Sequence, residues 1–118
     1  MLRARGTHFE RLAETKLQNS GLRTLARNFS CRVGEIDLVM EDATTIVFVE
    51  VRYRNSAAFG GPLESITSAK QLRLVRAAQV FLQRHPAYAS RECRFDAVGI
   101  SGTEERPDIC WIKSAFSA

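Results

Sequence analysis

The sequence predicts an α/β domain whose elements follow the order α-β-β-β-α-β-β. Two segments, residues 7–20 and 67–84, repeat apolar side chains at helical spacing. Most of the other regular segments alternate apolar and polar residues or are rich in β-branched and aromatic side chains, which is typical of strands. The length of 118 residues matches one domain, so we expect residues 1–118 to fold as a single unit.

The first helix is predicted from residues typical of a helix start and a helix end. Thr7 and Glu10 fit a capping box, with threonine at the N-cap and glutamate at the third helical position. Gly21 is a natural C-terminal stop, and a strand over residues 22–31 follows. The side chains expected to face the core recur at helical spacing: Phe9, Leu12, Ala13 and Leu17.

A hairpin of two strands, residues 35–40 and 46–53, is the most informative segment. If its turn is symmetric, paired residue numbers sum to 87, which places Asp37 opposite Glu50. Opposed Cβ atoms lie roughly 4.5–5.5 Å apart, and like charges there are destabilising. A bound divalent cation is the simplest reason for such a pair, because Mg²⁺ prefers oxygen ligands. The alternative is a solvated outer face with scattered charges.

Alternation assigns the hairpin side chains to two faces. The first is an apolar core face with Ile36, Leu38, Met40, Val47, Val49, Val51 and Tyr53. The second is polar but partly covered, and it carries Glu35, Asp37, Val39, Phe48, Glu50, Arg52 and Arg54.

The second half of the chain begins with a loop over residues 55–63, rich in glycine. Thr67 or Ser68 can cap the second helix, which should end before Pro86 because the residue preceding a proline avoids helical geometry. Strands are predicted at residues 93–100 and 108–113, with Asp96 in a structural pair with a basic side chain such as Arg94. The predicted core stripe of the helix is Leu72, Val75, Ala78, Phe81 and Leu82.

Composition narrows the classes of function. Seventeen basic residues against thirteen acidic ones give a net charge of +4, which favours a polyanionic partner. No apolar run approaches the ~20 residues that span a bilayer, and the first residues lack the apolar core of a secretory signal. We therefore expect a cytoplasmic protein without a membrane partner. Three cysteines without CxxC spacing predict neither a zinc site nor a disulfide framework.

Asp37 followed by Glu50-Val51-Arg52 resembles the PD-(D/E)XK nuclease motif, with arginine where lysine is usual and no proline before the aspartate. More of the chain resembles the YraN-like bacterial family, a resemblance carried by GEIDL, VFVEVRYR, FGGP, Lys70-Gln71 and CRFD. These resemblances imply a restriction-endonuclease-like fold with a mixed central sheet flanked by helices. That fold is similar to the one of archaeal Holliday-junction resolvases.

The resemblance also implies a function, that of a divalent-metal-dependent nuclease acting on DNA, including branched DNA. The expected partner is therefore nucleic acid, and the resolvase likeness implies a homodimer. The alternatives are a catalytically inactive nucleic-acid-binding module and a protein-interaction domain on the same fold.

Each role falls on a residue of this chain. Asp37 and Glu50 would hold Mg²⁺ or Mn²⁺, with the Val51 carbonyl as a third oxygen. Glu10 would complete the centre, unless it is only the capping-box partner of Thr7. The other expected site residues are cationic: Arg52 at the lysine position, and Arg32, Arg54 and Lys70 for nucleic acid.

Overall fold

The computed structural model describes residues 2–53 and 66–118, with side chains from His8 onward. The predicted element order is confirmed. The helices and strands are α1 (Leu2–Asn19), β1 (Arg23–Cys31), β2 (Gly34–Asp42), β3 (Thr45–Tyr53), α2 (Ser68–Arg84), a 3₁₀ turn (Pro86–Tyr88), β4 (Cys93–Gly102) and β5 (Pro107–Phe116). None of the helices in this described part is both long and apolar enough to cross a membrane.

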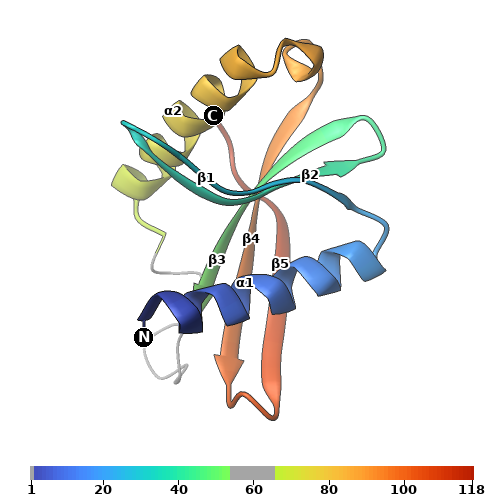
Figure 1. The fold of residues 1–118 in the computed structure, drawn as a ribbon, viewed down its shortest axis with the longest axis vertical. Coiled ribbons are helices and arrows are strands. Elements are labelled where there is room, and N and C mark those ends of the chain that lie inside the picture. Colours follow the sequence, from blue (N-terminus) through green and yellow to red (C-terminus); the bar gives the residue numbers. More distant parts are fainter. Residues whose placement is uncertain (1, 54–65) are drawn as a thin grey trace.

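The five strands form one mixed sheet in the order β1-β2-β3-β4-β5. Only β3 and β4 run parallel, and the other neighbours are antiparallel. Parallel neighbours need a long crossover, and α2 lies in the connection between these two strands. The two helices pack on opposite faces of the strongly twisted sheet, so the expected mixed sheet flanked by helices is confirmed (Figure 1).

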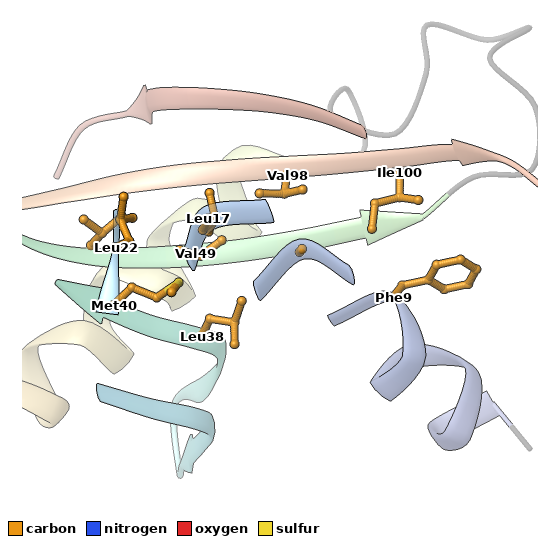
Figure 2. Close-up of a cluster of buried hydrophobic side chains, with 10 residues drawn as sticks. Phe9, Leu17, Leu22, Leu38, Met40, Val49, Val98 and Ile100 are labelled. Atoms are coloured by element: carbon orange, nitrogen blue, oxygen red, sulfur yellow. The ribbon is translucent and has the colours of Figure 1, made fainter. Parts of the chain in front are cut away.

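One hydrophobic cluster lies between α1 and the sheet. Phe9, Ala13 and Leu17 of α1 are almost fully buried there, as the helical spacing predicted. Figure 2 shows Phe9 and Leu17 on the side of the sheet where labelled residues of β2, β3 and β4 point. The strand residues of the cluster are Leu38, Met40, Val47, Val49, Val98 and Ile100.

A second cluster lies between the sheet and α2, and it corrects the expectation of a polar second face. Val39 and Phe48 are fully buried in it, because α2 covers this side of the hairpin. Ile36, predicted to share a face with Leu38, also belongs to this cluster. The alternation breaks between these two residues, where Asp37 has no ladder partner and Asn28 on β1 adopts φ of 52°.

The starts of the two helices were both predicted, one wrongly and one correctly. The backbone is already helical from Leu2, so Thr7 lies inside α1 and the capping-box prediction is wrong. Glu10 is therefore not held at a helix start. The N-cap of α2 is Thr67, whose Oγ1 accepts a hydrogen bond from the Lys70 N–H at 3.2 Å, as one of the two predicted caps.

The buried stripe of α2 differs in part from the prediction. Leu72 is 50% exposed, whereas Leu74 is only 6% exposed and packs in the second cluster. The stripe that reaches the sheet consists of Leu74, Ala77, Ala78 and Phe81.

Asp96 on β4 is fully buried and satisfied. It accepts hydrogen bonds from Arg94 Nε, Trp111 Nε1 and the Ser114 N–H, each at 3.0 Å. The expected structural pair with Arg94 is confirmed, and the same carboxylate joins β4 to β5.

The two leucines of α2 provide a test of this packing. Leu74→Ala should lower the free energy of unfolding by about 2–5 kcal/mol, because it removes buried methyl groups and leaves a cavity. Leu72→Ala, the matched control, should change it by less than about 0.5 kcal/mol. Urea unfolding followed by circular dichroism measures both. Equal losses for the two variants would contradict the observed orientation of α2.

Candidate metal centre

The hairpin has the predicted register up to the point where its strands separate. Residue numbers sum to 87 in the ladder that runs from Asp42↔Thr45 to Leu38↔Val49. Asp37 and Glu50 come next, but no backbone pairing joins them. Instead, the Asp37 Oδ2 accepts a hydrogen bond from the Val51 N–H at 2.7 Å. The carboxylate thus replaces a backbone acceptor and is fixed beside β3.

Glu50 lies against Asp37 in a mostly buried position. Burial, followed by the negative charge of Asp37 and a hydrogen bond with it, raises the pKa of Glu50 to about 8. The positive charges of Arg52 and Lys70 act in the opposite direction. Arg52 Nη1 lies 3.4 Å from Glu50 Oε2, because residues two apart on a strand project from the same face.

Glu10 approaches the same aspartate from α1. Burial and then the charge of Asp37, with a hydrogen bond to it, raise the pKa of Glu10 to about 7. A hydrogen bond with the Asn28 side chain works against this rise. Asp37 therefore interacts with carboxyl groups from both α1 and β3. Three ionised carboxylates this close would repel one another, so the arrangement is unfavourable without a neutralising charge.

The donor set fits a hard divalent cation. Mg²⁺ usually takes one or two protein carboxylates, with water and phosphate oxygens completing its shell. Asp37 and Glu50 supply the two carboxylates, and Val51 borders the same cavity. Residues 2–53 and 66–118 contain no group of three or more His, Cys, Asp or Glu side chains already assembled as ligands. Glu10 lies beside the pair through its interaction with Asp37.

The carboxylates open onto a cavity of about 410 Å³ between β2, β3 and the first turns of α2. Three acidic and three basic side chains line it, so an anion can find positive charge beside the carboxylates. The lining residues are Gly34, Glu35, Asp37, Glu50, Val51, Arg52, Lys70, Arg73 and Leu74.

Of the remaining expected site residues, one lines the cavity, one lies away from it and one is outside the described residues. Lys70 lines the cavity, whereas Arg32 is exposed in the β1–β2 turn and does not line it. Arg54, like the loop over residues 55–63, lies outside the described residues. Two residues were missed, Asn28 and Arg73. The three-residue spacing of Arg73 from Lys70 on a predicted helix was a usable signal, but nothing in the sequence indicated Asn28.

Comparison with known proteins identifies the family. Residues 9–100 match the sequence profile described as "Uncharacterised protein family UPF0102". The chain belongs to the UPF0102 family. The match includes Glu10, Asp37 and Glu50, and it confirms the resemblance to the YraN-like bacterial family.

UPF0102 proteins of other bacteria align with most of this chain. A UPF0102 protein of Stutzerimonas stutzeri is 52% identical over 113 residues, covering 96% of this chain and 94% of its own. One of Nitrosococcus oceani is 49% identical over 114 residues, with 97% and 92% covered. One of Pseudomonas putida is 55% identical over 102 residues, with 85% and 82% covered.

The raised pKa values predict an unusual pH dependence of stability in EDTA. A carboxyl whose folded pKa exceeds its unfolded value of about 4.5 stabilises the fold fully below that value, and the contribution disappears as pH rises through the folded pKa. The free energy of unfolding should therefore fall between pH 5 and 8. Glu50→Gln should weaken this fall, because one of the two titrating groups is gone. Urea unfolding at several pH values measures it, and identical slopes for both proteins would contradict the raised pKa of Glu50.

Proposed function

We propose that this UPF0102 protein is a divalent-metal-dependent nuclease with a restriction-endonuclease-like fold, which hydrolyses phosphodiester bonds in DNA. The observation that carries the proposal is the position of Asp37 between Glu10 and Glu50, where β2 and β3 separate beside a cavity that Arg52, Lys70 and Arg73 also line. Carboxylates set against one another in a mostly buried site cost stability, and a bound cation would offset that cost.

Topology and motif support the same proposal. The mixed sheet with one helix on each face agrees with the fold that the nuclease resemblance implies. Asp37 and Glu50-Val51-Arg52 lie on the two strands of the hairpin, as the motif requires. Branched DNA is the substrate we favour, because the resemblance extends to junction resolvases, and a homodimer would present two such centres to a symmetric junction.

The chemistry divides among a few residues. When bound, Mg²⁺ lowers the pKa of a coordinated water and neutralises charge on the phosphate. Asp37 and Glu50 would hold it, with the Val51 carbonyl as a further oxygen, and Glu10 would add negative charge and a hydrogen-bond acceptor beside Asp37. Lys70 and Arg52 would face the anionic substrate.

Arg52 stands where the motif has lysine, and it restricts the mechanism. A guanidinium stays protonated, so Arg52 can orient a phosphate and balance its charge but cannot accept a proton. This substitution favours one alternative, an inactive nucleic-acid-binding module that keeps the fold. Cleavage assays with Mg²⁺ and Mn²⁺ separate the two, because only the nuclease would cut DNA.

Asp37→Asn should abolish Mn²⁺ binding and cleavage while leaving the fold intact. The variant loses a ligand charge, but its amide oxygen can still accept the Val51 N–H bond. Calorimetric titration with Mn²⁺ and cleavage of junction, flap, single-stranded and duplex DNA measure the result. The free energy of unfolding should stay within about 1 kcal/mol, since an opposed like-charge pair is also removed. Asp108→Asn, on exposed β5, removes the same charge elsewhere and should keep both activities.

Arg52→Lys should cut DNA as well as the parent or better in Mg²⁺. A lysine ammonium is compact and its pKa can shift, so it can fill roles that arginine cannot. Initial cleavage rates of parent and variant at equal Mg²⁺ concentration decide this. The inactive-module alternative would replace our proposal if both proteins were inert on every DNA form and on RNA, and neither bound Mn²⁺.

A further inference from the structure

Helix α2 is cationic along its whole length. Its 17 residues include one lysine and three arginines and contain neither aspartate nor glutamate. By contrast, α1 carries Glu10 and Glu14 among its basic residues. Like charges on one helix repel one another, so an unbalanced set of four is a feature that an anionic partner would stabilise.

The cations of α2 are not spread evenly around its axis. Lys70, Arg73 and Arg76 follow one another at intervals of three residues, which places them on successive turns. Lys70 is half-buried at the cavity, Arg73 lines the cavity and is exposed, and Arg76 is exposed. The row therefore starts at the carboxylate cavity and winds outward to the surface. The flank of α2 on the other side of its buried stripe has no charge and carries Gln71, Val75 and Leu82.

A further cation joins this row from the sheet. A Cβ atom built on Gly34 would lie 3.2 Å from the carbonyl oxygen of Arg73, so β2 and α2 are in close contact there. Arg32 is exposed only two residues before Gly34, in the β1–β2 turn. The close contact thus brings this turn alongside the helical row.

These arginines also differ from others in their partners. Within the described parts of the chain, Arg32, Arg73 and Arg76 take part in no ion pair with a carboxylate. In this they differ from five other arginines that each pair with an acidic side chain, namely Arg23, Arg27, Arg52, Arg91 and Arg94.

We propose that Arg32, Arg73 and Arg76 form a track that binds the sugar–phosphate backbone of a nucleic acid strand leading into the cavity. This inference rests on the proposed function and adds the path of the substrate. Lys70 to Arg76 cover about 9 Å along the helix axis. That distance is the axial rise of two to three nucleotides at about 3.4 Å each. Contacts to phosphates carry no sequence information, so binding along the track should tolerate any base sequence.

The test is the binding of a fluorescein-labelled single-stranded oligonucleotide in EDTA, followed by anisotropy across a salt series. Arg73→Gln with Arg76→Gln should lower the slope of log K against log salt by about 1.4, since each phosphate contact on a single strand contributes about 0.7. If parent and variant bind equally at 1 M salt, the variant should bind about 25-fold more weakly than the parent at 0.1 M salt.

The matched control is Lys16→Gln with Arg106→Gln, which removes the same two charges from exposed positions on α1 and the β4–β5 turn. It should leave the slope unchanged. Urea unfolding of both double variants checks that they are folded. Equal losses for the two double variants, or no loss for the track variant, would overturn the track.

Failure of the track and failure of the nuclease proposal give different results. The track variant should bind Mn²⁺ like the parent, because Arg73 and Arg76 are not ligands. If the parent binds Mn²⁺ and cuts DNA while the track variant binds the strand as tightly as the control, only the track is wrong. If the strand binds along the track but no protein binds Mn²⁺, the track stands and the nuclease proposal fails.

Discussion

The β2–β3 hairpin pairs from its turn to Leu38↔Val49, and beyond that pair the two strands separate. At the separation the Asp37 carboxylate takes the Val51 N–H that a backbone carbonyl would otherwise accept. Both the core and the site depend on this local break. Before it, the side chains of both strands pack under α1 and α2, and after it β2 diverges and leaves room for the cavity. Residues of both strands beyond this break line the cavity, so the site lies where the ladder is interrupted.

The acidic residues of this protein fall into two groups according to what faces them. Asp96 is fully buried, but three donors satisfy it. Burial acts to raise the pKa of Glu14, yet hydrogen bonds from Arg27 and Thr24 hold it below its usual value. Asp37, Glu50 and Glu10 face one another instead. Groups matched with donors stabilise the fold, whereas mutually opposed carboxylates are tolerated where a site needs negative charge.

Features that depend on the local spacing of residues and on the symmetry of a turn could be predicted from the sequence. The element order, the hairpin register, the N-cap at Thr67 and the structural role of Asp96 followed from spacing and turn residues. The errors arose where distant segments decide the outcome. The second face of the hairpin was expected to be polar and only partly covered, because alternation cannot reveal that α2 packs against it. Thr7 carried a capping signature, but the helix begins earlier. The approach of Asn28 to Glu10 depends on how β1 packs against α1, which no spacing encodes.

Arg52 links the structural and the proposed roles of the site. Its Nη1 lies 3.4 Å from Glu50 Oε2, and its positive charge acts against the rise in the pKa of Glu50. A divalent cation on the same carboxylates would weaken this attraction, because it competes for their negative charge. The guanidinium would then balance the charge of a phosphate at the cavity. In the proposed function one arginine therefore has two roles, to pair with Glu50 and to face the substrate phosphate, although it cannot accept a proton. On the proposed track, the outer phosphates would lie against the arginines of α2, which form no ion pair with a carboxylate in the described parts of the chain.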